Sequence, residues 1–112
     1  MVKYKDVLSR TFAALADPTR RYVLERLRRG PAAVSELAEP HGLSLPGMLK
    51  HVRLLEQAGL LRTTKDGRVR RCGLSPRPLR DASRYLDRYR ALWESRFDAL
   101  AEYLERMKER ES

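Results

Sequence analysis

The 112-residue sequence has no asparagine or isoleucine, a single cysteine and only two histidines. A lone cysteine, Cys72, cannot form a disulfide within the chain, so cysteine usage does not indicate an oxidising compartment. No apolar run approaches the roughly 20 residues that a membrane-spanning helix needs, and the amino-terminal segment carries charges on both sides of its short apolar patch. We therefore expect a cytoplasmic protein that does not contact a membrane.

Motifs of catalysis are also missing. The sequence has no glycine-rich phosphate loop, no nucleophile elbow and no carboxylate pair on an evident cleft. His51 is expected to be a buried, hydrogen-bonded residue and His41 an exposed turn residue. Cys72 is expected to be a buried, unreactive thiol, with a redox switch as the alternative. The sequence therefore predicts a protein that is not an enzyme and has no cofactor.

Positive charge, by contrast, is abundant, and the formal net charge is +9. The excess of arginine over lysine and the missing residue types are typical of a GC-rich genome, and that bias alone explains a basic protein. It would, however, spread the charge evenly, whereas residues 1–43 carry +3, residues 44–80 carry +7 and residues 81–112 carry −1. The concentration in residues 44–80 indicates a surface that binds phosphate groups.

The first half of the chain has apolar residues at helical spacing, and the whole length fits a single domain over residues 1–112. Asp17 is a favoured N-cap and is followed by proline, which is favoured at the first helical position. Pro40 ends a shorter helix, because proline cannot continue an interior turn. The expected helices cover residues 3–16, 18–28 and 34–39.

A fourth helix is expected from Ser44, which can cap it, to about Gln57. At 100° per residue its apolar residues form one narrow stripe, while Lys50 and Arg53 lie on the opposite side. One face can therefore pack against a core while the other is free to contact a ligand. The apolar stripe consists of Met48, Val52 and Leu55.

Two extended runs follow and flank Asp66-Gly67, a dipeptide that suits a tight two-residue hairpin loop. Side chains alternate along a strand. One side of the return strand is therefore expected to hold Arg68, Arg70, Cys72 and Leu74, and the other Val69 and Arg71.

The last segment, from Arg77 to about Met107, has large apolar residues at helical spacing and no glycine or proline after Pro78. At about 1.5 Å per residue this helix would be roughly 45 Å long, longer than so small a domain can cover. We expect a second copy of the chain to cover it, with residues 3–16 and 78–107 at the interface; an apolar inducer pocket among its aromatic residues is the alternative. The expected interface side chains are Val7, Leu8, Phe12, Leu86, Tyr89, Trp93, Phe97, Leu100 and Leu104.

The order helix, helix, short helix, turn, helix, hairpin, helix describes a winged helix-turn-helix, a mainly α fold with a small β-hairpin. In this fold the helix after the turn enters the major groove, and the hairpin, or wing, contacts the DNA backbone or the minor groove. The Ser44 hydroxyl and the first-turn amides are suited to phosphate. The candidates on the recognition helix are Ser44, Leu45, Pro46, Gly47, Leu49, Lys50 and Arg53, and those on the wing are Lys65, Arg68, Arg70 and Arg71.

Four segments together resemble the ArsR/SmtB-type bacterial repressors over nearly the whole chain. They are FAALADPTRRYVLERL, VSELAEPHGLSLPGMLKHVRLLEQAGLL, KDGRVRRCGL and a terminal helix that contains RYRALWESRFDALAEYL. The resemblance implies a homodimer on a promoter, with the first and last helices at the dimer interface. It places residues 44–53 on the family's recognition helix and residues 65–71 on its wing.

Two departures from the family pattern affect this expectation. Metal-sensing members carry a Cys-x-Cys pair in the third helix, where this chain has Ala38 and Pro40, and the terminal helix has no histidine. A tetrahedral metal site needs three or four convergent ligands, so we expect no metal. In the reading helix, Gly47, Met48 and Leu49 replace the usual small and hydroxyl residues. Leu49 either touches a thymine methyl group or packs against the wing.

We therefore expect a sequence-specific transcriptional regulator, a homodimeric repressor that binds double-stranded DNA at an inverted-repeat operator, with an inducer that the sequence does not identify. Two other functions stay open: a winged-helix module that binds a protein, and an architectural protein that binds DNA without sequence preference. The arginines at positions 20, 21, 26, 28 and 29 are expected to form a solvated face. Phosphate contact is the alternative for Arg20 and Arg21.

Overall fold

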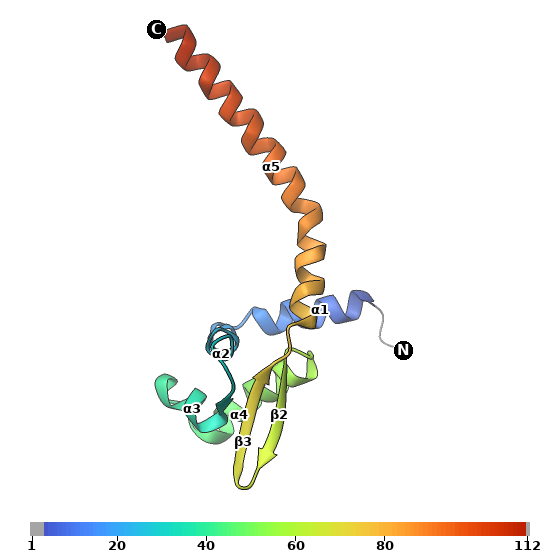
Figure 1. Ribbon diagram of the computed structural model, residues 1–112, viewed down its shortest axis with the longest axis vertical. Coiled ribbons are helices and arrows are strands. Elements are labelled where there is room, and N and C mark those ends of the chain that lie inside the picture. The colour runs from blue at the N-terminus through green and yellow to red at the C-terminus, as the bar shows by residue number, and fades with distance from the viewer. Residues whose placement is uncertain (1–3, 112) are drawn as a thin grey trace. The chain divides into compact units, whose positions relative to one another are not determined.

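The computed structural model describes residues 4–111 and has the expected mainly helical fold with a small antiparallel sheet (Figure 1). The chain divides into two compact units, residues 1–82 and residues 83–112. We call their described parts the head (residues 4–82) and the distal helix (residues 83–111). No helix of the described chain is long and apolar enough to span a membrane. The elements are α1 (Tyr4–Leu15), α2 (Pro18–Leu27), β1 (Ala32–Ala33), α3 (Val34–Ala38), the 3-10 helix η1 (Glu39–His41), α4 (Leu45–Gln57), β2 (Leu61–Asp66), β3 (Val69–Leu74) and α5 (Arg77–Glu111).

Helices α2 and α4 begin where the sequence places a capping side chain. Asp17 Oδ2 accepts a hydrogen bond from the backbone N–H of Arg20 (3.0 Å), and Ser44 Oγ accepts one from the backbone N–H of Gly47 (3.2 Å). Each bond satisfies an amide that the first helical turn leaves without a partner. Both predicted helix starts are confirmed.

Two arginines near the start of α2 hold the preceding helix. Arg20 donates from Nε to the carbonyl oxygen of Ala14 (2.8 Å) and from Nη2 to that of Ala13 (3.1 Å). Arg21 Nη1 donates to the carbonyl oxygen of Leu15 (2.7 Å). These carbonyls lie at the end of α1, where acceptors lack helical partners and a positive charge favours the helix dipole. The expected solvated face is therefore wrong for Arg20, and it is also wrong for Arg26, which is half-buried and donates to the carbonyl oxygen of Gly30 (3.2 Å), whereas Arg21 stays exposed.

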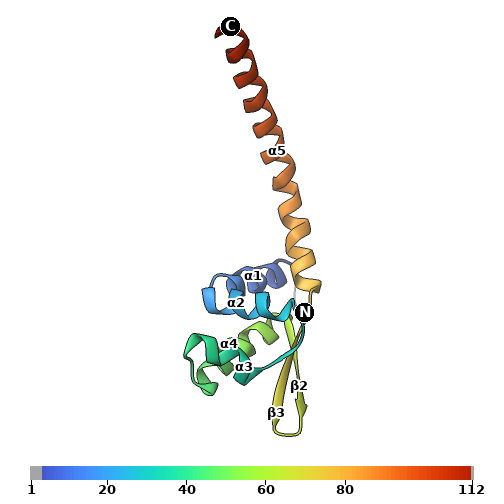
Figure 2. The same cartoon turned by 60° about the vertical axis from the view of Figure 1, so that its left-hand side comes forward.

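The core of the head lies between the helices and the sheet, and Figure 2 shows α1 and α2 above α3 and α4 with the hairpin beside them. Leu37 of α3 and Leu60, just before β2, are fully buried. Pro78 and Ala82 of α5 are also buried, so this helix begins as part of the head. Helix α4 turns one face into this core and the other outward. Its buried stripe is the predicted one, Met48, Val52 and Leu55, each at most 1% exposed.

The sheet has three antiparallel strands in the order β1-β3-β2. The sequence predicts the hairpin of β2 and β3 but not β1, in which Ala32 pairs with Cys72 and Ala33 with Arg71. Two alanines carry no periodic signal, so this strand is defined only by its pairing with β3. It attaches the start of α3 to the wing.

The hairpin loop lies one residue further along the chain than predicted. Asp66 pairs with Val69, so the two loop residues are Gly67 and Arg68. Gly67 has φ +64°, and a glycine at the first loop position suits a tight hairpin. Arg68 therefore lies at the tip of the wing, contrary to the prediction that it shares one side of β3 with Arg70.

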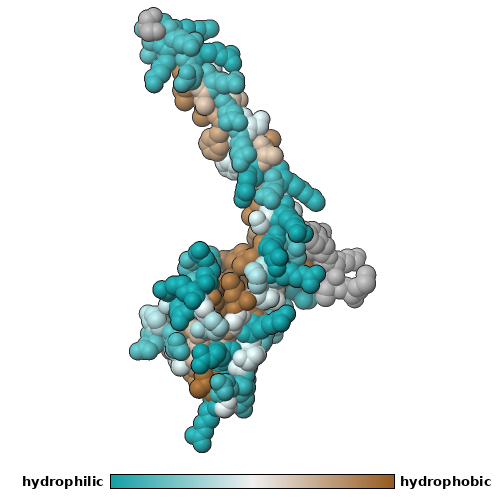
Figure 3. Space-filling view, in the orientation of Figure 1, coloured by the Kyte–Doolittle hydropathy of each residue, from teal (hydrophilic) through white to brown (hydrophobic). Residues whose placement is uncertain are grey.

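The distal helix exposes large apolar side chains among hydrophilic ones (Figure 3). Trp93 is 62% exposed, and Leu86, Leu100 and Met107 are exposed as well. These four residues are seven positions apart, so they lie on one face of the helix. We call them the apolar row. An exposed row of this size is typical of a surface that contacts another protein chain.

Candidate nucleic-acid interface

The outward face of α4 forms the first part of the candidate interface. Of the predicted residues, Gly47 and Leu49 are half-buried, and the others, Ser44, Leu45, Pro46, Lys50 and Arg53, are exposed. A Cβ at position 47 would lie 3.2 Å from Ser44 Oγ, so a larger residue there would crowd the hydrogen bond that caps the helix. Lys50 and Arg53 form no ion pair within residues 4–111. Helix α4 thus presents two unneutralised cations outward.

The wing brings a second group of cations beside α4. Lys65 of β2 pairs directly with Arg70 of β3, and both are exposed. Neither they nor Arg68 at the tip form an ion pair in the described part of the chain. Like charges directly opposite each other on antiparallel strands destabilise a hairpin. An anion such as a phosphate group would relieve this repulsion if it were bound between Lys65 and Arg70.

The other face of the wing is also basic. Arg71 pairs with Thr64 and Arg62 with Gly73, and both arginines are exposed. The sequence prediction includes Arg71 but omits Arg62, although alternation from the buried Leu61 places its neighbour on the outer face. The wing therefore carries cations on both faces and at its tip.

A pair of hydrogen bonds joins the end of α4 to the wing. Glu56 Oε2 accepts one from the backbone N–H of Thr63 (3.1 Å) and one from Thr63 Oγ1 (2.7 Å). Glu56 lies in the last turn of α4, and Thr63 lies in β2 opposite Cys72. The contact therefore fixes the position of the wing relative to the outward face of α4. Sequence reasoning missed it, because a glutamate and a threonine seven residues apart form no recognisable motif.

A hollow of about 380 Å³ lies between α4 and the wing, and the end of β1 and the start of α3 also line it. Apolar side chains of both elements line it next to the cations of the wing, so the two elements form one continuous surface of mixed character. The apolar side chains are Leu45, Leu49 and Val69, and the cations are Lys65, Arg68 and Arg70.

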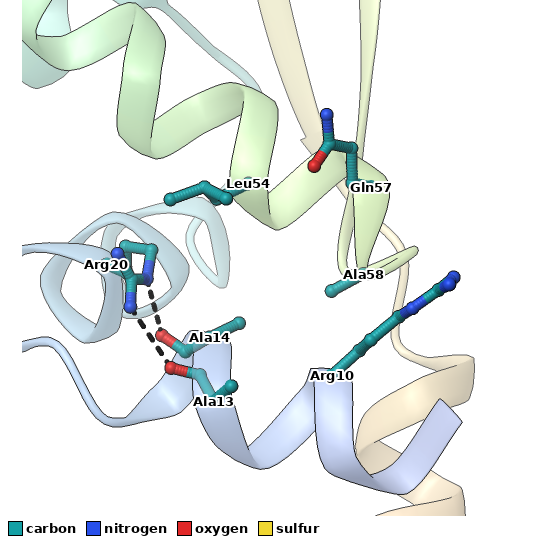
Figure 4. Close-up of a pocket in the computed structure, with 7 residues that line it drawn as sticks. All are labelled: Arg10, Ala13, Ala14, Arg20, Leu54, Gln57 and Ala58. Carbon is teal, nitrogen blue, oxygen red and sulfur yellow. Dashed lines mark hydrogen bonds between the residues drawn. The ribbon is translucent and has the colours of Figure 1, made fainter. Parts of the chain in front are cut away.

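A second hollow, of about 470 Å³, lies between α1, α2 and α4 (Figure 4). Small residues of α1 and Leu54 of α4 form much of its wall. The Arg20 guanidinium donates hydrogen bonds to the two backbone carbonyls drawn in Figure 4. The Arg10 side chain points away from Arg20. Among the residues that the structure describes, Arg10 and Arg20 are the charged ones that line this hollow, and no carboxylate, histidine or cysteine does. It offers no group suited to acid-base or metal chemistry.

His51, on the inner flank of α4, is half-buried, but its predicted hydrogen bond is wrong. Its Nδ1 is buried without a hydrogen-bond partner and lies 3.7 Å from Asp17 Oδ2. That carboxylate already accepts the Arg20 backbone N–H, a bond that holds the pKa of Asp17 below its ordinary value. The second histidine, His41, is exposed as predicted and contacts the Tyr22 ring edge-on, with ring centroids 4.1 Å apart.

Cys72 and the acidic residues do not combine into a reactive site. The Cys72 side chain is buried, as predicted, and burial raises the pKa of its thiol to about 11. The thiol is therefore protonated at neutral pH, and a protonated thiol is a poor nucleophile. Among residues 4–111, no three His, Cys, Asp or Glu side chains lie close enough together to hold a metal ion.

The side chains predicted to join two subunits are found in α1 and in the distal helix. In α1, Phe12 is 36% exposed and Val7 half-buried, while Leu8 is buried within the protomer. All the predicted residues of the distal helix are exposed, and exposed Tyr103 and Met107, which the prediction omits, extend the same surface. The predicted residues there are Leu86, Tyr89, Trp93, Phe97, Leu100 and Leu104.

Known proteins resemble this chain in both sequence and fold. Residues 15–64, which include α2, α3 and α4, match the model of a family described as a helix-turn-helix domain. The HTH-type transcriptional regulator Rv2034 of Mycobacterium tuberculosis is 40% identical over 80 residues, which cover 71% of this chain and 75% of the relative. This relative is a regulator of transcription by its name.

Solved structures extend the likeness to most of the chain. The crystal structure of the ArsR family transcriptional regulator RHA00566 is 49% identical and covers 85% of this chain and 98% of that chain, with a TM-score of 0.76. The solution structure of Mb0332 from Mycobacterium bovis, a homodimeric winged helix-turn-helix DNA-binding domain, is 21% identical, covers 84% of each chain and has a TM-score of 0.61, which shows a shared fold. The chain therefore belongs to the ArsR family of winged helix-turn-helix transcriptional regulators, which bind DNA and are not enzymes.

Proposed function

We propose that this protein is a homodimeric repressor that binds an inverted-repeat operator and occludes a promoter. The observation that carries the proposal is the Lys65–Arg70 pair, two cations held directly opposite each other on the wing without an acidic partner among residues 4–111. Such a pair costs stability in the free protein, whereas two phosphate groups of DNA would turn it into favourable contacts. A surface that binds a neutral or basic protein gains nothing from two unpaired cations placed opposite each other.

The two elements of this surface have different roles in the proposal. Lys50 and Arg53 lie on the outward face of α4, where long basic side chains reach guanine edges in the major groove. Lys65, Arg68, Arg70 and Arg71 contact phosphates or a narrow minor groove. Ser44 and the first-turn amides of α4 add a phosphate contact, because the positive end of a helix dipole favours an anion. In this proposal α4 recognises the base sequence, and the wing contributes affinity that does not depend on sequence.

The dimer is formed by the apolar row of the distal helix with the neighbouring exposed residues Tyr89, Phe97 and Leu104, together with Phe12 and Val7 of α1. Trp93, at 62% exposure, and Phe97, at 59%, are too large and too apolar to be favourable in water. The Mycobacterium bovis domain that shares this fold is a homodimer. Two copies of α4 in such a dimer contact successive major grooves, about one helical turn apart, so the operator is an inverted repeat.

Regulation by this protein does not use a metal ion. The positions where metal-sensing relatives carry a Cys-x-Cys pair hold Ala38 and Pro40, and a metal site needs three or four convergent ligands. Zinc, cadmium, nickel or arsenite should therefore leave operator affinity within a few-fold. A tenfold metal-dependent release, which is about 1.4 kcal/mol of coupling, would contradict this part of the proposal. The regulator acts in the cytoplasm, because its partner is a bacterial promoter.

The proposal is tested by binding titrations of the wild type, Arg53→Ala and Arg70→Ala. The probes are duplexes that the protein selects from a random library and scrambled duplexes, each at several salt concentrations. Arg53→Ala should weaken the selected duplex by about 1–3 kcal/mol and relax the preference at one base pair in each half-site. Arg70→Ala should weaken both duplexes alike and flatten the salt dependence by about one unit for each phosphate group that the variant no longer neutralises.

The matched control is Arg88→Ala, which removes one exposed positive charge from the distal helix and should change neither readout. If Arg70→Ala abolishes discrimination while Arg53→Ala changes only the salt dependence, the roles of α4 and the wing are reversed. If no sequence is enriched but all duplexes bind, the protein is an architectural DNA-binding protein. If no duplex binds, this surface does not bind DNA and the proposed function is wrong.

A further inference from the structure

The head exposes few large apolar side chains, and two of them border the candidate interface. Among the side chains that the structure describes in residues 6–82, the exposed ones are Phe12, Leu45, Leu54 and Val69, and Leu45, at 50%, is the most exposed of them. Leu45 and Val69 both line the hollow between α4 and the wing. Lys65, on the same hollow, is a cation. Two apolar side chains thus stay exposed to water within a surface that is otherwise strongly basic.

A partner for this surface must be anionic and must also present an apolar group next to its charges. DNA meets both conditions in the major groove, where thymine carries a C5-methyl group beside the phosphate backbone. Leu45 is the first residue of α4, and the amino-terminal residues of a recognition helix are those that contact base edges. Leu49, one turn later, is half-buried against the core, so Leu45 offers the more accessible apolar surface.

We propose that Leu45 is a specificity-determining residue that packs against the methyl group of a thymine in each half-site. This inference rests on the proposed function, since it requires α4 to enter the major groove. Val69 and the exposed edge of Leu49 flank the methyl group and exclude water from it. The pairing makes thymine preferred over the other bases at one position of each half-site, beside the positions read by Lys50 and Arg53.

The matched control for Leu45 is another leucine of α4. Leu54 is 47% exposed, close to the value for Leu45. It lines the hollow shared with α1 and α2 rather than the one beside the wing. Truncating either leucine removes the same atoms from a half-exposed site on the same helix. A difference between the two variants therefore reports contact with DNA and not a general effect on the helix.

The experiment uses the full chain and the duplex that it selects from a random library. Each thymine of a half-site is replaced in turn by deoxyuridine, which removes only the methyl group. One position should weaken wild-type binding roughly fourfold, and the same change in both half-sites roughly fifteenfold, as the burial of one methyl group predicts. Leu45→Ala should bind the thymine and uracil duplexes equally, while Leu54→Ala should keep the wild-type difference.

Each outcome decides for or against the inference. If no thymine position is sensitive in the wild type, or if Leu45→Ala retains the sensitivity, the inference is wrong while sequence-specific binding stands. The same holds if Leu54→Ala loses the sensitivity as Leu45→Ala does. If the library selection enriches no sequence, the proposed function fails first. The wild-type arm needs no variant, so a folding defect in Leu45→Ala does not prevent a decision.

Discussion

The head and the distal helix differ in the burial of their large apolar side chains. In the head, Leu37, Leu55 and Leu60 are fully buried, and each is covered by residues of the same chain. In the distal helix, Trp93 and Phe97 are more than half exposed. A helix gains most of its stability from packing its apolar face, and an unpacked one is marginal in water. The head therefore buries its apolar residues within its own fold, whereas the distal helix leaves its apolar face exposed, as the proposed dimer requires.

The same two regions also differ in charge. Residues 44–80, which hold α4 and the wing, carry a net charge of +7, whereas residues 81–112 carry −1. Ion pairs along the distal helix, such as Arg90 with Asp87 (3.4 Å) and Arg106 with Glu102 (3.6 Å), use charges of both signs. A nearly neutral helix can meet a second copy of itself without net repulsion, while the basic region of the head repels its own copy and attracts DNA.

The largest expected effect comes from removing the apolar row. Trp93→Ala together with Leu100→Ala deletes four large side chains from the proposed dimer and should raise its dissociation constant on the order of a thousandfold or more. Sedimentation should then show a species near 13.0 kDa in place of one near twice that mass. The control pair, Asp98→Ala with Glu105→Ala on the opposite side of the helix, should remain dimeric. A wild-type monomer at micromolar concentration would show that the distal helix does not join two copies of the chain.

A smaller effect is expected from the core of the head. Leu55→Ala removes a fully buried side chain and should lower the free energy of unfolding by about 2–5 kcal/mol, because it also leaves a cavity. Leu54→Ala, at the adjacent and half-exposed position, should cost less than about 1 kcal/mol. Denaturant titrations followed by circular dichroism measure both. Equal losses for the two leucines would mean that the head is not organised around this core.

The smallest expected effect is a pH dependence of the free energy of unfolding that comes from the buried Cys72 thiol. Burial raises the pKa of this thiol from 9.0 to about 11, so its contribution to stability is complete below pH 9 and is lost as pH rises through 11. In that window the unfolded chain ionises while the folded chain does not. The wild type should lose on the order of 1 kcal/mol more stability than Cys72→Ala between pH 8 and pH 10.

The groups that titrate in both proteins cancel in this difference, so lysine and tyrosine ionisation does not disturb it. Parallel pH curves for the wild type and Cys72→Ala would show that water reaches the thiol in the folded head. Rapid labelling of the native protein by a thiol reagent at pH 8 would contradict the buried position in the same way.

The sequence was informative wherever structure depends on near neighbours. Asp17 and Ser44 cap the helices that follow them because each bonds an amide three residues away, and such short contacts are visible in sequence. The stripe of α4 and the apolar row follow from helical spacing for the same reason. For the candidate interface, this local information identified the exposed cations Lys50 and Arg53, but it placed Arg68 in a strand instead of at the wing tip.

Patterns in the sequence alone predict the order of helices and hairpin, the concentration of positive charge in residues 44–80 and the apolar face of the last helix. Four other contacts are visible only in the folded head: Glu56 bonds Thr63, Arg20 holds the end of α1, Lys65 faces Arg70, and Ala32 joins the sheet. Periodicity and capping report contacts within one turn or one strand. These four contacts instead join separate elements or depend on strand register, which are set by how the elements pack around the common core.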